Sequence, residues 1–221
     1  MYNRIEVFLS EFDTLYKLQF GFRKKHSTEH ALLSIVEEIR KNLDNGIFTC
    51  GVFIDLEKAF DTVNHNILLS KLDHYGIRDN ALNWLTSYLT NRKQFVKLNG
   101  SESKNGNICC GVPQGSILGP LLFTIYINDM HQAVTSSKMH HFADDTNIIF
   151  SNKYTKLMEK ILNKELKSVF EWLCANRLSI NVTKTEFIIF RPPKKQFNQR
   201  IVLKLNGIKI FQSPKIKYLL G

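Results

Sequence analysis

Two adjacent carboxylates interrupt an apolar run in the second half of the chain. Asp144 and Asp145 lie inside the segment His141–Phe150, with apolar residues before and after them. Because Asp is a poor strand residue and a good turn residue, the pattern predicts a strand, a tight turn that carries both acids, and a second strand. Two like charges about 4 Å apart repel by roughly 4 kcal/mol at an effective dielectric constant near 20. The pair therefore indicates either a solvated hairpin tip or a place where a cation binds.

A third acid ends another apolar run. Residues 50–56 read Cys-Gly-Val-Phe-Ile-Asp-Leu, the pattern of a strand buried on both faces. Asp55 at the end of such a strand is unfavourable unless it is paired or binds a metal, and hard oxygen ligands suit Mg²⁺. Three carboxylates from two strands can hold two ions about 3.5–4 Å apart, as in phosphoryl-transfer enzymes. Asp55, Asp144 and Asp145 are therefore the candidate catalytic and metal-binding residues.

The charge of the chain favours a polyanionic partner. Its 221 residues have a net charge of +10 and a pI near 9.4, which suits nucleic acid, although many basic proteins are basic only for solubility. The four cysteines lack zinc-finger spacing, and there is no leading signal segment and no apolar run of about 18 residues. We expect a reduced intracellular protein, in the nucleus or the cytoplasm, with no membrane partner.

Helical and extended patterns alternate irregularly. Apolar spacing predicts helices over about 27–43, 64–75, 79–89, 117–130 and 156–176. Extended segments are expected at 92–98, 107–112 and 187–190, with a hairpin over 201–211. The first helix is expected to begin at Ser27 or Thr28 and to bury a stripe of Leu32, Ile35, Val36, Ile39 and Leu43. This order predicts an α+β fold rather than a doubly wound parallel sheet.

A series of segments, in family order, resembles the motifs of reverse transcriptases, most closely those of non-LTR retrotransposons of the jockey kind. They are Gln19–Arg23, Phe53–Asp61, Gly111–Pro120, Phe142–Asp145, Asn181 with Lys184-Thr185, and Lys217–Gly221. The resemblance implies a right-hand polymerase with fingers and palm, and an antiparallel palm sheet packed on helices. Residues of about 1–46 and 62–110 would belong mainly to the fingers, and 47–61 and 111–221 mainly to the palm. The thumb is expected to be absent, because the chain ends where the primer grip begins.

The resemblance also implies a role for individual residues around two Mg²⁺ ions. Asp55 and Asp144 would bridge the ions, Asp145 would support them, and the Leu56 carbonyl would be a further ligand. Nucleotide-binding residues would be Arg23, Phe60, Gln114, Gly115 and Lys184. The primer grip would include Lys217, Tyr218, Leu219 and Gly221. The partners would be an RNA template, a DNA primer and deoxynucleoside triphosphates.

Simpler interpretations stay open for several of these residues. Phe60 can fill the core, Gly115 can serve a plain turn, and Arg23 and Lys184 can belong to solvated faces. Asp61 is expected to cap a helix.

Other conspicuous side chains have simpler interpretations too. His140 and His141 lack a third ligand at metal-binding spacing. Trp84 and Tyr88 are expected in the core or on a helix face rather than as a base-stacking platform.

Two functions follow as hypotheses. The first is RNA-directed DNA polymerase, in which the primer 3′-hydroxyl attacks the α-phosphate of a deoxynucleotide by two-metal-ion phosphoryl transfer during retrotransposition. The second is a truncated or domesticated remnant that binds nucleic acid without catalysis. The intact acids favour the first, and the expected truncation favours the second.

Overall fold

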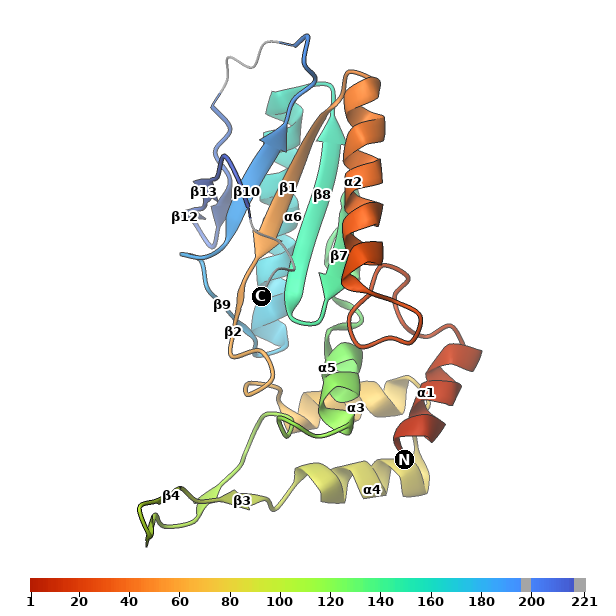
Figure 1. Cartoon of the computed structure of the whole chain (residues 1–221), viewed down its shortest axis with the longest axis vertical. Helices are drawn as coiled ribbons and strands as arrows, with labels where there is room; N and C mark the ends of the chain where they lie inside the picture. The colour runs from red at the N-terminus through yellow and green to blue at the C-terminus, as the bar shows by residue number, and fades with distance from the viewer. Residues whose placement is uncertain (196–199, 217–221) are drawn as a thin grey trace. The chain divides into compact units, whose positions relative to one another are not determined.

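A five-stranded sheet carries the acidic turn in the computed structural model, which describes residues 1–195 and 200–216. The strand order is β13-β10-β1-β8-β7 (Figure 1). The bounds are β1 Phe48–Ile54, β7 Lys138–Phe142, β8 Asp145–Asn152, β10 Glu186–Phe190 and β13 Phe211–Gln212. Neighbouring strands are antiparallel, except that β10 and β13 run parallel.

The central strand β1 is buried on both faces, as the sequence predicts. Every residue of Phe48–Ile54 is buried except the half-buried Phe53. Its register pairs Cys50 with Phe150 of β8 on one side and with Ile189 of β10 on the other. Since a strand flanked by two others and covered on both faces meets no water, only a continuous apolar run satisfies it.

Helix α2 (Thr28–Asp44) covers one face of this sheet, and Figure 1 shows it in front of the strands. Its first turn is capped by Ser27, whose side chain accepts a hydrogen bond from the His30 backbone nitrogen at 3.2 Å. Ile35 and Ile39 pack against Ile149 of β8. The expected apolar stripe is wrong in part, because Leu32 and Val36 remain 47% and 37% exposed. The face of α2 that packs on the sheet is therefore narrower than the full set of apolar residues in the predicted stripe.

Helix α6 (Thr155–Ala175) lies behind the sheet in Figure 1 and contacts β8. Its buried face consists of Met158, Leu162, Leu166, Val169 and Leu173. Leu157, next to Met158, is exposed. The 3-10 turn η1 (Met130–Ala133) belongs to the same compact unit as the sheet. So do two short antiparallel strand pairs. They are β2 with β9 (Leu56–Glu57 and Ser179–Ile180) and β11 with β12 (Lys204–Leu205 and Ile208–Lys209).

A second group of elements is mainly helical. It contains α1 (Tyr2–Glu11), α3 (His65–His74), α4 (Asp79–Leu89) and α5 (Leu118–Ile127). All residues of α5 but Pro120 are buried, so this helix forms the centre of the group. The cap of α3 is Asn64, whose side chain accepts from the Ile67 nitrogen at 3.1 Å. The expectation that Asp61 caps a helix is wrong, because its carboxylate accepts a hydrogen bond from the Gln114 side chain instead.

The extended segments after α4 are shorter than predicted. The segment 92–98 breaks into β3 (Lys93–Gln94) and β4 (Lys97–Leu98), which pair with β6 (Gly106–Asn107) and β5 (Ser101–Glu102). The strand expected over 107–112 is wrong beyond Asn107. Gly111 has a φ of +86°, which ends the extended conformation, and its backbone nitrogen donates to the Val63 carbonyl instead.

These elements form two compact units. The helical unit contains Met1–Leu15 and Lys58–Ile127, and the sheet unit contains Tyr16–Glu57 and the described residues from Asn128 onward. The mixture of helices and a mainly antiparallel sheet confirms the predicted α+β class. The division into fingers and palm stays a prediction. Among the residues that the structure describes, no helix is both long and apolar enough to cross a bilayer.

Candidate active site

Asp55 follows the last residue of β1, where the chain leaves the sheet. Its backbone nitrogen donates to the Thr185 hydroxyl at 3.4 Å, and its carbonyl accepts from the Asn181 nitrogen at 2.9 Å. The side chain is half-buried. The backbone of Asp55 is thus held on both sides, which leaves its carboxylate at the end of the strand.

The predicted strand–turn–strand is confirmed, but of the two acids only Asp144 lies in the connection, and Asp145 is the first residue of β8. Phe142 pairs with Asp145, so that Ala143 and Asp144 form a two-residue connection between β7 and β8. Ala143 has a φ of +57°, a left-handed conformation that non-glycine residues adopt rarely and that recurs at functional turns. Both Asp144 and Asp145 are exposed.

The sheet register brings the three acids to the same end. Ile54 of β1 pairs with Thr146 of β8, so the next residue of β1 and the preceding residue of β8 are Asp55 and Asp145. The pKa of Asp145 is raised, first by desolvation of its carboxyl and then by the negative charges of Asp144 and Asp55. The three carboxylates therefore share one electrostatic field, although they come from segments about ninety residues apart.

The donor chemistry of this group fits a hard divalent cation. Carboxylate oxygens are the ligands that Mg²⁺ prefers, and the repulsion that raises the pKa of Asp145 is relieved by a positive charge. Within 1–195 and 200–216, however, no group of three or more His, Cys, Asp or Glu side chains is arranged so that it could hold a metal ion. The acids share an end of the sheet without enclosing a common point.

A tight turn that carries Lys184 adjoins Asp55. The Asn181 side chain accepts from the Thr183 hydroxyl at 2.6 Å and from the Lys184 nitrogen at 3.2 Å, and the Asn181 nitrogen donates to the Asp55 carbonyl. Lys184 itself is exposed. The backbone contact brings this predicted nucleotide-binding residue into the same region as the acids, and it shows why an Asn stands three residues before it.

The segment Leu18–Gly21 pairs with the outer edge of β7. The Phe20 nitrogen donates to the His141 carbonyl at 2.8 Å, and the His141 nitrogen donates to the Leu18 carbonyl at 3.0 Å. The Arg23 guanidinium donates to the carbonyls of Tyr16 and Gln19 at 3.0 and 3.3 Å. The side chain of Arg23, a predicted nucleotide-binding residue, thus stabilises the loop of residues 16–23, which lies beside the acidic turn.

Buried polar side chains line the strands beneath the turn. Gln19, His140, His141 and Asn147 are each 1% exposed, and each has a nitrogen without a hydrogen-bond partner among the described residues. Burial lowers the pKa of His140 to about 4, with a further contribution from Lys138. Burial likewise lowers the pKa of His141 to about 3, and His131 and His140 add to it. Sequence reasoning missed this group because it judged the histidines only as metal ligands.

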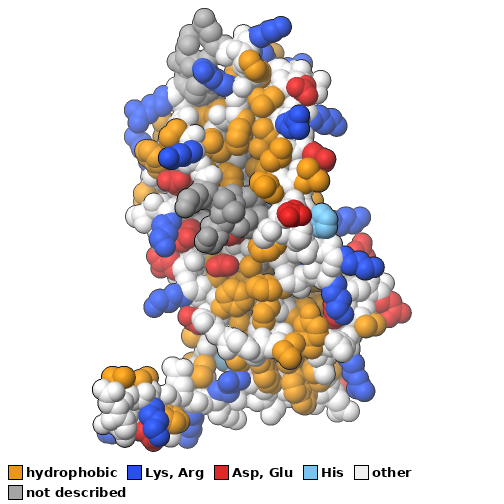
Figure 2. Space-filling model, in the orientation of Figure 1, with side chains coloured by type: hydrophobic (Ala, Val, Ile, Leu, Met, Phe, Trp, Pro, Cys, Tyr) orange, Lys and Arg blue, Asp and Glu red, His pale blue; other side chains and the backbone are white. Residues whose placement is uncertain are grey.

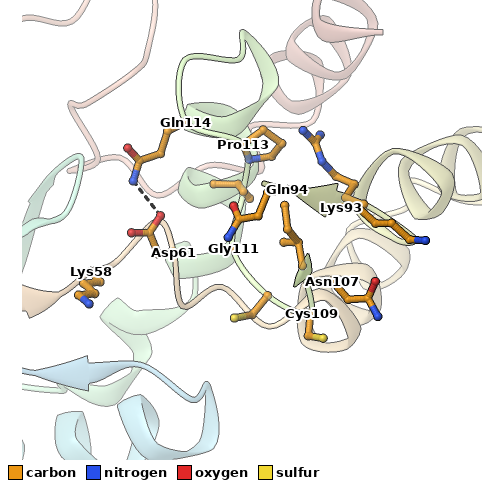
Figure 3. Close-up of a pocket in the computed structure, with 13 residues that line it drawn as sticks. Lys58, Asp61, Lys93, Gln94, Asn107, Cys109, Gly111, Pro113 and Gln114 are labelled. Atoms are coloured by element: carbon orange, nitrogen blue, oxygen red, sulfur yellow. Dashed lines mark hydrogen bonds between the residues drawn. The ribbon is translucent and has the colours of Figure 1, made fainter. Parts of the chain in front are cut away.

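The remaining predicted nucleotide-binding residues belong to the helical unit. Phe60 is half-buried and stacks on Phe123 of α5, with ring centroids 4.4 Å apart. Gln114 donates through Nε2 to the Asp61 carboxylate at 2.7 Å (Figure 3). Gly115 has a φ of +77°, and a Cβ on it would meet no atom within 4 Å. The positive φ of the turn accounts for a glycine at this position, and no neighbouring atom restricts the space around it. The predicted primer-grip residues Lys217, Tyr218, Leu219 and Gly221 lie outside the described residues.

The chain belongs to the reverse transcriptase family. The family model described as "Reverse transcriptase (RNA-dependent DNA polymerase)" matches residues 1–219. The acids at one end of an antiparallel sheet and the motifs in family order agree with that membership.

Individual relatives come from mobile elements of flies. The chain is 30% identical, over 98% of its length, to the probable RNA-directed DNA polymerase from transposon BS of Drosophila melanogaster. It is 32% identical, over 79% of its length, to the RNA-directed DNA polymerase from mobile element jockey of the same species. The predicted resemblance to the jockey kind is confirmed. The chain spans 24% and 20% of the lengths of these two relatives.

A solved structure supports the fold. Telomerase from Candida tropicalis, in complex with a TWJ fragment of telomeric RNA, superposes with a TM-score of 0.62 at 15% identity. The match covers 89% of this chain and 34% of that one. At this level of identity the likeness concerns the fold alone.

Proposed function

We propose that this chain is the polymerase part of a retrotransposon protein and extends a DNA primer on an RNA template. The observation that carries the proposal is the position of Asp55, Asp144 and Asp145 at one end of the sheet, where desolvation, and then the charges of Asp144 and Asp55, raise the pKa of Asp145. Like charges brought together at the end of a sheet are typical of sites where a bound cation offsets the repulsion. The membership of the chain in the reverse transcriptase family agrees with this chemistry.

Asp55 and Asp144 would hold two Mg²⁺ ions, with Asp145 and the Leu56 carbonyl in support. When bound, the ions would lower the pKa of the primer 3′-hydroxyl and neutralise the charge that develops on the leaving pyrophosphate. Because the acids do not enclose one point, the exposed Asp144 and Asp145 side chains must turn toward Asp55 when the ions bind. Their exposure leaves room for that rotation.

The other residues would position the nucleotide. Lys184 and Arg23 would bind the triphosphate, and Lys184 could protonate the departing pyrophosphate. Phe60 would lie under the sugar, and Gln114 and Gly115 would line the nucleotide pocket. Each role rests on the match between the residue and the family motif. An element that copies its RNA acts inside a cell, so an intracellular location is part of this proposal.

Primer extension on an RNA template, with and without Mg²⁺, tests the proposal. Asp144→Asn should abolish extension, whereas Asp44→Asn, at an exposed acid that ends α2, should leave it unchanged. Mg²⁺ should also raise the melting temperature of the wild-type chain by mass action, and Asp144→Asn should remove most of that rise. An Asp144→Asn chain that extends primers at the wild-type rate would overturn the metal assignment. Binding of template-primer without any extension would favour the non-catalytic remnant.

A further inference from the structure

Three side chains at intervals of four residues form a ladder at α4. The rings of Trp84 and Tyr88 are stacked, with centroids 5.5 Å apart and planes within 8°. The Arg92 guanidinium carbon lies 5.6 Å from the Tyr88 ring centroid, a cation–π distance. Trp84, at the far end of the ladder, is 44% exposed. Trp84 and Tyr88 lie on a face of α4, one of the two positions expected for them. Their stacked rings leave part of Trp84 exposed to solvent, and Arg92 lies against Tyr88 at the other end.

Arg92 also lines a hollow of about 680 Å³ in the same helical unit. Its basic side chains are Lys58, Arg92 and Lys93, against the single carboxylate of Asp61. Its neutral polar side chains are Gln94, Asn107, Gln114, Cys109 and Cys110. Figure 3 shows the Gln114 amide directed at Asp61, with Lys58 beside Asp61 and with Lys93 and Asn107 on the opposite side. Because three basic side chains face one carboxylate, the hollow has an excess of positive charge that can bind an anion.

The surface near this hollow is basic and partly apolar. Figure 2 shows Lys or Arg side chains beside hydrophobic ones at the lower left, where Figure 1 places β3 and β4. Phe95, Val96 and Leu98 are exposed there, next to Lys93 and to Lys97, and Lys97 forms an ion pair with Glu102 at 2.8 Å. A basic residue beside an exposed aromatic one, as Lys93 and Phe95 are here, is typical of surfaces that bind unpaired nucleotides.

We propose that the ladder and the hollow together form a binding site for single-stranded RNA, which we call the α4 site. A base stacks on the exposed Trp84 ring, and Arg92, Lys93 and Lys58 neutralise the phosphates that enter the hollow. The strand is single because bases in a duplex have no free face to stack on an aromatic ring. The Gln94 and Asn107 amides supply donors and acceptors for ribose 2′-hydroxyls, which favours RNA.

The α4 site takes from the proposed function only the choice of RNA as the partner. Gln114 in the wall of the hollow also belongs to the proposed nucleotide pocket, but Trp84, Arg92, Lys93 and Lys58 are distinct from that pocket and from the three acids. Stacking and phosphate binding require neither a metal nor a nucleotide. Binding at this site is therefore measured in the presence of a chelator, where no extension occurs. Failure of catalysis and failure of the α4 site then give different results.

The first experiment measures the affinity of the full chain for a short unstructured RNA by fluorescence anisotropy in a chelating buffer. Trp84→Ala should weaken binding roughly tenfold, the loss of about one stacked base, and Trp84→Phe should retain most of the affinity. Tyr154→Ala removes another exposed aromatic residue, 71% exposed at the start of α6, and should have no effect. Arg92→Ala should make the affinity less dependent on salt, because a phosphate contact is lost. Equal affinities of Trp84→Ala and the wild type would overturn the proposal.

The reactivity of the cysteines provides a second measurement of RNA binding, which can be made on the wild-type chain. Cys109 and Cys110 line the hollow, whereas Cys174 is exposed near the end of α6. Bound RNA should slow alkylation of Cys109 and Cys110 relative to Cys174, and Trp84→Ala should shift that protection to roughly tenfold higher RNA concentrations. Unprotected Cys109 and Cys110 at saturating RNA would overturn the α4 site, even in a chain that extends primers. Equal protection by DNA of the same sequence would overturn the assignment to RNA.

Discussion

Gly21 lies against Ala143, and no side chain fits between them. A Cβ on Gly21 would overlap the backbone nitrogen of Ala143 and lie 2.9 Å from the carbonyl carbon of Phe142. The Phe20 nitrogen donates to the His141 carbonyl, and the His141 nitrogen donates to the Leu18 carbonyl, so the two segments are held together on either side of Gln19. A glycine from the first motif therefore lets the backbone of that segment approach the turn that carries Asp144 and Asp145.

Substitution of this glycine should disturb the acidic turn. Gly21→Ala must displace backbone atoms, so we expect the free energy of unfolding to fall by about 1–3 kcal/mol. Primer extension should fall further than the loss of folded protein explains, since the turn carries two of the acids. Denaturant titration and extension assays measure the two effects. Gly106→Ala is the control, because its added Cβ would have only an ordinary contact, 3.8 Å from the Gln94 carbonyl oxygen. Equal effects of both substitutions would show that the close approach is unimportant.

Removing a charge from the acidic group should stabilise the metal-free chain. The pKa of Asp145 is raised first by desolvation and then by Asp144 and Asp55, whose charges repel it at neutral pH. Asp145→Asn should raise the free energy of unfolding in a chelating buffer by some tenths of a kcal/mol, about the size of the interaction between exposed charges. Glu37→Gln, at an exposed acid in the middle of α2, should give no such gain. If Asp145→Asn is neutral or destabilising in the chelator, the carboxylates do not repel one another in solution.

Acid should destabilise the sheet unit through its buried histidines. In the folded chain the pKa is lowered to about 4 for His140 and about 3 for His141, whereas an unfolded histidine has a pKa near 6.5. Between these values the unfolded chain binds more protons, so stability is present above about pH 6.5 and decreases as the pH falls toward 4. Each histidine contributes a slope of up to about 1.4 kcal/mol per pH unit.

Denaturant titrations across this pH range measure that slope. His141→Gln should reduce it, whereas His30→Gln, at an exposed position of α2, should leave it unchanged. An unaltered slope in His141→Gln would mean that another group governs the acid sensitivity.

Phe60 allows a test of its two interpretations. Its stacking on Phe123 supports a packing role, so Phe60→Val should lower the free energy of unfolding by about 1–3 kcal/mol. If the ring also excludes the 2′-hydroxyl, the same substitution should raise ribonucleotide use relative to deoxynucleotide use at least about tenfold, or roughly 1.4 kcal/mol in discrimination. The ratio of the two kcat/KM values measures this. A folded Phe60→Val chain with an unchanged ratio would limit Phe60 to packing.

The sequence predicted those elements that local patterns encode. Ser27 before an amphipathic segment predicted the start of α2, and a continuous apolar run predicted the buried strand β1. The two acids within an apolar run predicted the turn between β7 and β8. In each case the signal lies within a few residues, because capping, burial of a strand and turn formation depend on near neighbours. The family motifs added the expected roles of the acids and the candidate nucleotide-binding residues.

Other features were decided only by tertiary structure. Leu32 and Val36 have the right spacing for burial, yet the line along which α2 meets the sheet leaves them exposed. The approach of Gly21 to Ala143, the hydrogen bond from Gln114 to Asp61 and the alignment of Asp55 with Asp145 each join residues that are more than fifty positions apart. No local pattern encodes such pairs, because the partner of each residue is set by strand register and helix packing. The sequence by itself determined which side chains this protein has for its chemistry, and the fold decided which of them meet.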